Sequence, residues 1–307
     1  MSSVKNYLSL IKFSHTIFAM PFALIGFFLG IKTGLFEINI KNEFSGIDAE
    51  TRDVLYIKYF FIKFGLVVFC MIFARSAAMA FNRFLDRKFD AKNPRTAIRE
   101  IPKGIISEKN ALAFTIANCL LFVVCAYFIN PICFYLSPVA LFVILFYSYT
   151  KRFTVLCHLV LGLGLSLAPI GAYIAVTGRF DWLPLLFSFT VLFWVSGFDI
   201  IYALQDEEFD KANQLHSIPA MLGKKNALRV SQLLHVLSGF CVIYAGVYGK
   251  FGYWYWAGIV VFTGMLMYQH SIIKPNDLSK VNIAFMTANG IASVVFAIFV
   301  LLDLFFY

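Results

Sequence analysis

Two acidic clusters end apolar segments of this 307-residue chain and lie about 120 residues apart. They read Asn82-Arg-Phe-Leu-Asp86-Arg-Lys-Phe-Asp90 and Asp199-Ile-Ile-Tyr202-Ala-Leu-Gln-Asp206-Glu-Glu-Phe-Asp210. At about 100° per residue, a helix would place the polar residues of the first cluster within about 80° of one another. It would place the aspartates of the second within about 40°, with Tyr202 beside them. Carboxylates beside membrane-length helices indicate function, and two stripes of oxygen ligands favour hard divalent cations.

Magnesium suits such a site because it usually binds through one or two carboxylates together with substrate phosphates. Two facing Asp-x-x-x-Asp stripes predict two Mg²⁺ ions bridged by a diphosphate. Cations that would meet the phosphates lie in the nearby loops: Arg87, Lys88, Arg95, Arg99, Lys103, Lys151 and Arg152. Most of these also fit the simpler interpretation of positive anchors at a membrane face. For Lys151, which directly follows Tyr147-Ser-Tyr149-Thr, we favour the phosphate.

A diphosphate beside a hydrocarbon interior indicates a lipid diphosphate as the substrate. Divalent ions would stabilise the charge that develops on the departing diphosphate. An allylic prenyl chain would leave a carbocation, which aromatic π faces can stabilise. The chain has 36 Phe and 15 Tyr, and most of them fit an ordinary membrane core and interface belt. Tyr202 is the exception, because it lies inside the acidic stripe.

Arg75 is a second feature of the first acidic segment. It precedes Asn82 by seven residues, so it points in nearly the same direction but two turns deeper in the membrane. A buried guanidinium needs a partner, and a substrate carboxylate would suit its planar fork. The alternative is a structural ion pair with a carboxylate of the second segment, such as Asp199.

Composition identifies the class of protein. With 60% hydrophobic and 14% charged residues and a mean hydropathy of +0.78, the chain is not a soluble globule. Apolar runs long enough to cross about 30 Å of hydrocarbon recur along it. We predict nine membrane helices in one domain over residues 1–307. They lie near 13–32, 59–82, 111–129, 133–150, 155–177, 182–204, 229–248, 253–273 and 283–306.

The distribution of positive charge predicts the orientation. Eighteen Lys and Arg residues lie at the N-terminus and in the loops after the second, fourth, sixth and eighth segments, against seven on the other side. This excess places the N-terminus and both acidic clusters in the cytoplasm. It also accounts for the net charge of +9 without a nucleic acid partner. We expect segments 83–110 and 205–228 to be cytoplasmic loops that cap the site, and 37–58 to be a cover on the far side.

The remaining polar features are assigned no chemistry. The six cysteines show no metal-ligand spacing and fall mostly inside apolar runs, so we interpret them as small hydrophobic residues. A lone histidine such as His15, in the first apolar run, is more often packed than catalytic. An acidic stripe ends both the second and the sixth segment, which suggests a repeat of four helices with the site between the halves.

These residues and motifs resemble those of the UbiA superfamily of membrane prenyltransferases, and the resemblance covers nearly all of the chain. Asn82-x-x-x-Asp86-x-x-x-Asp90 resembles the first Asp-rich motif of that family, and Asp199-x-x-Tyr202-x-x-x-Asp206-x-x-x-Asp210 resembles the second. The run Asn93-Pro-Arg95-Thr-Ala-Ile-Arg99-Glu-Ile-Pro-Lys-Gly104 is similar to the loop after the first motif, and Tyr149-Thr-Lys151-Arg152 to the turn after the fourth helix. Lys12 differs from the Arg that many relatives have near the first helix.

The resemblance implies nine helices around a central cavity that opens sideways to lipid, with two Mg²⁺ ions under a cytoplasmic cap in the bacterial inner membrane. The implied metal ligands are Asn82, Asp86, Asp206 and Asp210, with Asp90 and Asp199 supporting them. The implied catalytic set is Asp86, Asp90, Asp206, Asp210 and Arg75. The implied substrate-binding set is Arg75, Arg95, Lys151, Arg152, Asp199 and Tyr202.

The implied reaction is transfer of a polyprenyl group from its diphosphate to a ring carbon of an aromatic acid in quinone biosynthesis. The chain looks most like the 4-hydroxybenzoate polyprenyltransferase branch. The form of the second motif also resembles a subgroup of the futalosine route to menaquinone, in which the acceptor is 1,4-dihydroxy-6-naphthoate. Both acceptors carry a carboxylate, so Arg75 does not separate them.

Two other classes fit less well. A transporter would distribute its carboxylates across the midplane and break a helix there, whereas these acids gather at one face. A phospholipid head-group transferase would show a tight Asp-Gly-rich motif, which we do not find.

Overall fold

The computed structural model describes residues 3–12, 18–44 and 46–307. These residues form helices and turns, with one isolated bridge between Lys274 and Asp277 and no strand. The helices are α1 (Ser3–Leu10), α2 (Met20–Lys32), α3 (Leu35–Glu43), α4 (Ala49–Lys92), α5 (Glu108–Ile129), α6 (Pro131–Thr150), α7 (Cys157–Thr177), α8 (Trp182–Ala203), η2 (Leu204–Asp206), α9 (Glu207–Ala212), α10 (Ile218–Tyr248), α11 (Tyr253–Ile272), η3 (Ile283–Ala288) and α12 (Asn289–Phe306).

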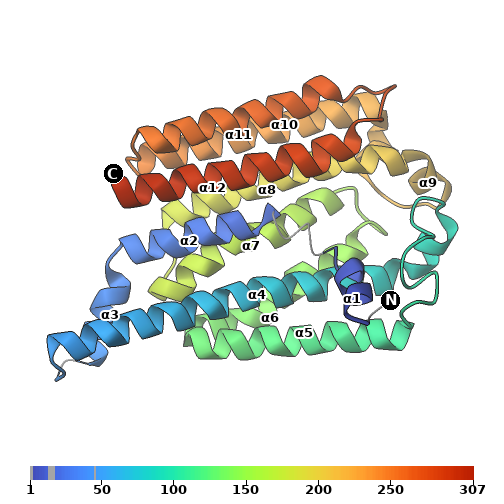
Figure 1. Ribbon diagram of the computed structural model, residues 1–307. Coiled ribbons are helices and arrows are strands. Elements are labelled where there is room, and N and C mark those ends of the chain that lie inside the picture. Colours follow the sequence, from blue (N-terminus) through green and yellow to red (C-terminus); the bar gives the residue numbers. More distant parts are fainter. Residues whose placement is uncertain (1–2, 13–17, 45) are drawn as a thin grey trace.

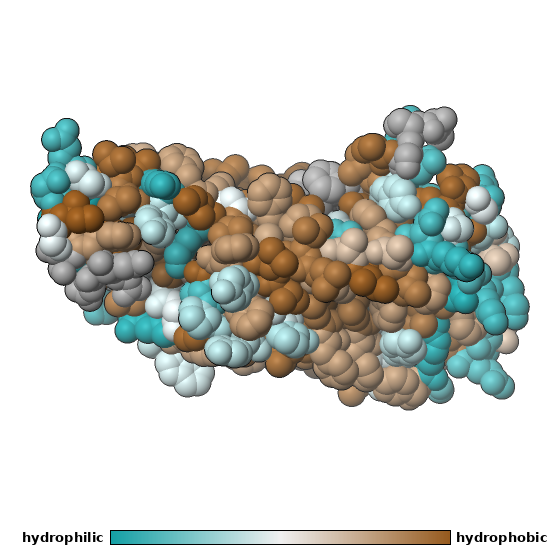
Figure 2. All heavy atoms as spheres, turned by 90° about the horizontal axis from the view of Figure 1, so that it is seen from below, coloured by the Kyte–Doolittle hydropathy of each residue, from teal (hydrophilic) through white to brown (hydrophobic). Residues whose placement is uncertain are grey.

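The long helices lie roughly parallel in a bundle (Figure 1). One side is formed by α8 with α10, α11 and α12, and the other by α4, α5 and α6, while α2 and α7 lie between them. Within the described ranges, seven helices are long and apolar enough to cross a membrane. Figure 2 shows a surface that is mostly apolar across its middle and hydrophilic toward both ends. The predicted class, an all-helical polytopic membrane protein, is confirmed.

The nine predicted segments each contain a helix, although their lengths differ from the prediction. Only 13 residues of the first segment are helical, in α2, and residues 13–17, which include His15, lie outside the described part of the chain. The second segment is much longer than predicted, since α4 has 44 residues and extends about 66 Å. Residues 49–58 of α4 belong to the predicted cover 37–58, and most of α3 lies in that segment as well.

Helix ends place the acidic motifs. Helix α4 continues through Asp90 and ends at Asn93, whose extended backbone (φ −87°, ψ 116°) precedes Pro94. A proline disfavours helical backbone in the residue before it, so the helix ends just beyond the first motif. Ser217 begins α10 by accepting a hydrogen bond from the Ala220 N–H, and Gly223 (φ 74°) then kinks that helix.

The core between α2, α8, α11 and α12 is aromatic. Phe22, Trp194, Phe262 and Phe296 are fully buried, and their ring centroids lie 5.3–6.3 Å apart. Pairs at these distances stabilise packing beyond the area that they bury. The Trp194 indole N–H donates to Asn289 Oδ1 at 2.9 Å, so its one polar atom is satisfied. This side is therefore a rigid wall for the site.

The predicted cap segments begin and end in helix. Residues 83–92 are the last turns of α4, and 205–228 include α9 and the first turns of α10. Figure 1 places α9, the α4–α5 connection and the N-terminus at one end of the bundle, and the C-terminus at the other. Both acidic motifs lie at the end that carries α9.

Candidate active site

The first acidic motif is held by arginines from the chain around it. Asn82 Nδ2 donates to Asp86 Oδ2 at 3.0 Å, and Arg152 Nη2 donates to Asp86 Oδ1 at 2.7 Å. One turn on, the buried Asp90 accepts from Arg99 Nη1 at 2.6 Å and lies 4.0 Å from Arg83 Nη1. Helical spacing thus brings the three motif residues to one face, as predicted, and each carboxylate meets a guanidinium.

The second motif is joined to the loop after the first. Arg95 donates from Nε and Nη2 to the two oxygens of Asp206, and from Nη1 to the Tyr202 hydroxyl at 2.9 Å. Its guanidinium also lies 5.2 Å from the Tyr202 ring centroid, and Asn93 Nδ2 donates to Asp206 Oδ1 at 3.2 Å. Burial would lower the pKa of Arg95, but Asp206 and Tyr202 raise it. Arg95 therefore stays positively charged and links the two motifs.

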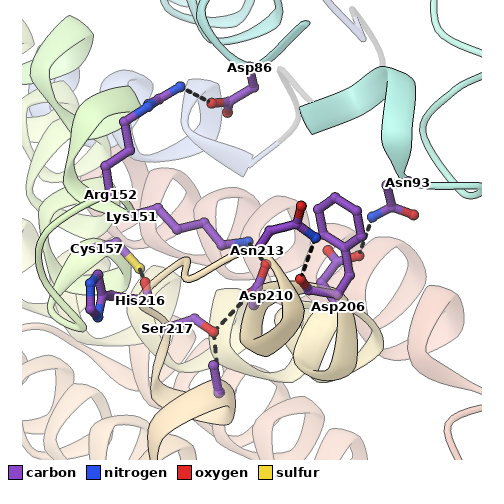
Figure 3. A network of polar contacts seen from close by, with 12 residues as sticks. Asp86, Asn93, Lys151, Arg152, Cys157, Asp206, Asp210, Asn213, His216 and Ser217 are labelled. Atoms are coloured by element: carbon purple, nitrogen blue, oxygen red, sulfur yellow. Dashed lines mark hydrogen bonds and ion pairs between the residues drawn. The ribbon is translucent and has the colours of Figure 1, made fainter. Parts of the chain in front are cut away.

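Lys151 and Arg152 join the two motifs a second time. Figure 3 shows these neighbours after α6 reaching to opposite sides, Lys151 toward Asp210 and Arg152 toward Asp86. Lys151 Nζ is 2.7 Å from Asp210 Oδ1, and Ser217 Oγ donates to Asp210 Oδ2 at 2.8 Å. Burial would lower the pKa of Lys151, but the Asp210 carboxylate raises it above its ordinary value. Lys151 is therefore charged at neutral pH.

Asp199 lies one turn before Tyr202 and pairs with a residue that the sequence did not indicate. Its Oδ2 is 2.6 Å from Nδ1 of His158, near the start of α7. The alternative ion pair between Asp199 and Arg75 is not observed. Helix α7 places His158 beside α8, a tertiary contact that helical periodicity within one segment does not reveal.

Arg75 lines an apolar cavity of about 330 Å³ between α4, α5, α6 and α7. Its Nε is buried without a hydrogen-bond partner, and it makes no ion pair with a described carboxylate. The other cavity walls carry Met71, Ala140, Leu161 and similar side chains, with the phenol of Tyr147 among the few polar groups. Burying the Arg75 guanidinium in an apolar cavity without a partner costs free energy, unless the carboxylate of a ligand pairs with it.

The donor set suits a hard divalent cation, since it consists of carboxylate oxygens and the amide of Asn82. Among the described residues, no three acidic, histidine or cysteine side chains converge into a complete metal site. That fits Mg²⁺, which takes one or two carboxylates and completes its shell with water and substrate phosphates. Asp86 and Asp206 are each paired with an arginine, so binding of an ion would compete with these two pairs.

Four contributing residues had no predicted role and are identified by tertiary contacts: Asn93, Tyr147, His158 and Ser217. Asn93 and Tyr147 stood in the predicted motifs without a role. Ser217 had a local indication, because Ser before Ile-Pro is typical of a helix start. His158 had none beyond being a histidine one turn into an apolar segment.

These features define a helical membrane protein with a cation-rich acidic centre above an apolar cavity. Residues 58–291 match the model of the UbiA prenyltransferase family, and the chain belongs to that family. It is 31% identical to a 4-hydroxybenzoate octaprenyltransferase of Nitrosomonas europaea over 76% of this chain and 80% of that one. It is 29% identical to the enzyme of the same name from Francisella tularensis subsp. mediasiatica, over 81% and 85%.

Solved structures share the fold. The apo structure of a UbiA homolog from Aeropyrum pernix K1 has a TM-score of 0.74 at 25% identity, over 95% of this chain and 97% of that one. A UbiA homolog from Archaeoglobus fulgidus bound to GPP and Mg²⁺ has a TM-score of 0.66 at 19% identity, over 97% and 99%. The all-helical bundle is therefore the fold that this chain shares with these UbiA homologs.

The Lys151–Asp210 pair gives a stability prediction. Because folding raises the pKa of Lys151, the pair stabilises the fold fully below the unfolded lysine pKa of about 10.4. That contribution is lost as pH rises through the higher folded value. Lys151→Met should therefore melt several degrees below wild type at pH 8 in detergent, and the difference should shrink above about pH 11.

Lys41→Met is the control, because Lys41 forms an i,i+4 pair with Glu37 in which both side chains are exposed. Exposed pairs contribute little, so its melting temperature should stay near that of wild type. A Lys151→Met protein that melts like wild type at pH 8 would contradict the prediction.

Proposed function

We propose that this protein transfers a polyprenyl group from polyprenyl diphosphate to a ring carbon of a 4-hydroxybenzoate-like aromatic acid, in quinone biosynthesis. The curated relatives named above support this acceptor, since both are called 4-hydroxybenzoate octaprenyltransferases. The runner-up acceptor is 1,4-dihydroxy-6-naphthoate, with the same chemistry at the same site.

One observation carries the proposal: two acidic motifs with paired cations lie at the end of the bundle, and an unpartnered guanidinium lies deeper, in an apolar cavity. The charged end suits a diphosphate, the apolar walls suit a prenyl chain, and Arg75 suits a small carboxylate. The diphosphate, the prenyl chain and the acceptor carboxylate would thus each bind to groups of suitable chemistry.

The pairs at the charged end are expected to exchange partners. When a diphosphate enters, Arg95, Lys151 and Arg152 would turn from carboxylates to phosphate oxygens, which bind guanidinium and ammonium groups well. The freed oxygens of Asn82, Asp86, Asp90, Asp206 and Asp210 would hold two Mg²⁺ ions, whose charge stabilises the departing diphosphate. The exchange keeps every buried charge paired before and after binding.

The acceptor ring is expected to lie between Arg75 and the charged end. A bidentate contact from Arg75 to its carboxylate would fix the ring beside C1 of the prenyl chain. Tyr202 contacts Arg95, and Asp199 lies one turn before Tyr202 on α8, so we expect both to border the same space. Ionisation of the allylic diphosphate comes first, attack by the electron-rich ring follows, and loss of a ring proton restores aromaticity.

We place the acidic end at the cytoplasmic face of the bacterial inner membrane, because that end carries most of the positive charge. A periplasmic reporter fused after Tyr307 should be active, since the two termini lie at opposite ends of the bundle.

The direct test of the function is product analysis. Purified protein in detergent receives polyprenyl diphosphate, Mg²⁺ and equal amounts of the two acceptors, and mass spectrometry identifies the products. A C-prenylated 4-hydroxybenzoate supports the proposal, a prenylated naphthoate favours the runner-up, and the absence of both refutes it.

The metal clamp gives the first functional prediction. Asp86→Ala and Asp206→Ala should each reduce turnover by about two to four orders of magnitude, as loss of an electrostatic clamp does. Removal of Mg²⁺ with EDTA should abolish it. Glu208→Ala is the control, because this exposed glutamate in the same segment should leave turnover unchanged. Near-normal turnover in either aspartate variant would refute the assignment.

The second functional prediction concerns Arg75. Arg75→Ala should reduce kcat/KM for the acceptor by roughly 30- to 1000-fold, or about 2–4 kcal/mol, and change the KM for prenyl diphosphate little. Arg75→Lys should restore only part of this, because a point charge cannot replace the fork. Equal losses for both substrates would instead indicate a structural role.

The third functional prediction concerns the apolar cavity that Arg75 lines. Gly164, Ala168, Gly171 and Ala175 are spaced by four, three and four residues, so they form one small-residue face of α7 about 16 Å long, and all line the cavity. A Cβ at Gly171 would meet no atom within 4 Å. Gly171→Leu should therefore fill the cavity and favour short prenyl diphosphates such as geranyl over long ones.

Gly264→Leu is the matched control, since a Cβ there also meets no atom within 4 Å but the residue lies in α11, away from the cavity. Its preference for chain length should equal that of wild type. An unchanged preference in Gly171→Leu, measured with geranyl and octaprenyl diphosphate in competition, would remove this cavity from the prenyl site.

A further inference from the structure

We propose that His158 is a positioning residue for proton removal: it holds Asp199 so that the second oxygen of this carboxylate receives the proton that the acceptor ring loses. The inference rests on the proposed function and deepens it. The proposed reaction ends with loss of a ring proton, and the pair that could take up this proton forms only when α7 and α8 pack together.

The imidazole of His158 is fixed at both nitrogens. It is 2% exposed, its Nε2 accepts from the Ile218 backbone N–H at 3.4 Å, and its Nδ1 lies 2.6 Å from Asp199 Oδ2. Because Nε2 accepts from Ile218, we place the ring proton on Nδ1, which donates it in a hydrogen bond to Asp199. The ring therefore orients the carboxylate, in the way that second contacts orient functional side chains.

The start of α10 connects this pair to the acidic centre. Ser217, directly before Ile218, is fully buried and donates to Asp210 Oδ2 at 2.8 Å while capping the helix. One short segment thus fixes His158 on one side and Asp210 on the other. The start of α10 therefore holds the His158–Asp199 pair next to the acidic centre.

Asp199 faces the site. It precedes Tyr202 by three residues and Asp206 by seven, so the three share one helix face, and Arg95 binds the latter two from that side. The Asp199 side chain is 23% exposed, whereas its neighbours Phe198 and Ile200 are buried. Its Oδ1 makes no hydrogen bond or ion pair with any described residue.

The pair also lies beside the cavity. His158 precedes Leu161 by three residues and Leu165 by seven on α7, and both leucines line the cavity. The imidazole and its carboxylate therefore lie one turn nearer the charged end than the apolar walls. This is the level at which the ring of the acceptor would meet C1 of the prenyl chain.

The chemistry of Asp199 differs from that of the other acids. Both carboxylate oxygens of Asp86, Asp206 and Asp210 contact described side chains, whereas Asp199 has only its Oδ2 bound, by His158. In the step we assign, the bond between the ring carbon and prenyl C1 forms and the C1–O bond breaks, with its electrons leaving on the diphosphate. The electron pair of the ring C–H bond then restores aromaticity, and the proton moves to Asp199 Oδ1.

The test is a kinetic isotope effect with 4-hydroxybenzoate deuterated at the ring carbons beside the hydroxyl. In wild type we expect ionisation to limit the rate, so deuterium should have almost no effect. In His158→Ala the rate should fall by about 10- to 100-fold, and proton removal should become limiting, giving a clear primary isotope effect. The KM for prenyl diphosphate should not change. His158→Gln should recover part of the rate, because its amide N–H can still orient Asp199.

His216→Ala is the matched control, since this nearby histidine is exposed and only its backbone makes contacts with described residues. It should keep the wild-type rate and isotope effect. If His158→Ala does not fold, Asp199→Asn provides the same test, because the amide keeps the shape but takes no proton. A folded His158→Ala or Asp199→Asn protein without an isotope effect overturns the inference alone. The absence of product from wild type overturns the proposed function and, with it, this inference.

Discussion

The structure depends on the pairing of buried carboxylates with cations that come from elsewhere in the chain. Lys151 and Arg152 are adjacent in sequence, yet one binds Asp210 on α9 and the other binds Asp86 on α4 (Figure 3). Arg95 adds a link from the loop after α4 to Asp206. An unpaired charge at this depth is costly, so each acid requires its partner. These pairs bring two distant motifs to one end of the bundle.

The rest of the fold supports that centre. The aromatic core around Trp194 keeps α8 fixed against α2, α11 and α12, so the second motif lies on a rigid wall. On the other side, α4 carries the first motif to its end at Asn93 and lines the cavity with Arg75 two turns below Asn82. The charged end, the single guanidinium and the apolar walls follow one another along α4. This order matches a substrate with a diphosphate head, a reacting carbon and a hydrocarbon tail.

Sequence periodicity predicted the helices and the faces of both motifs, because each is a property of one segment. It did not predict which cation meets which acid, since those contacts depend on how helices pack: Asp199 meets His158 and not Arg75. It also placed the start of α4 ten residues late, because Asp48 caps a polar first turn that hydropathy does not detect. Periodicity did not show the cavity either, because it lies between four helices; only the family resemblance implied it.

The central claim is that the cations and carboxylates exchange partners when diphosphate and Mg²⁺ bind together. Calorimetry of Mg²⁺ binding, with and without an unreactive prenyl thiodiphosphate, tests it directly. The exchange predicts strong coupling: the analogue should raise Mg²⁺ affinity by at least about tenfold, and Mg²⁺ should raise analogue affinity by the same factor. Asp206→Ala should abolish that coupling. Affinities that are independent of one another in the wild-type protein would contradict the account.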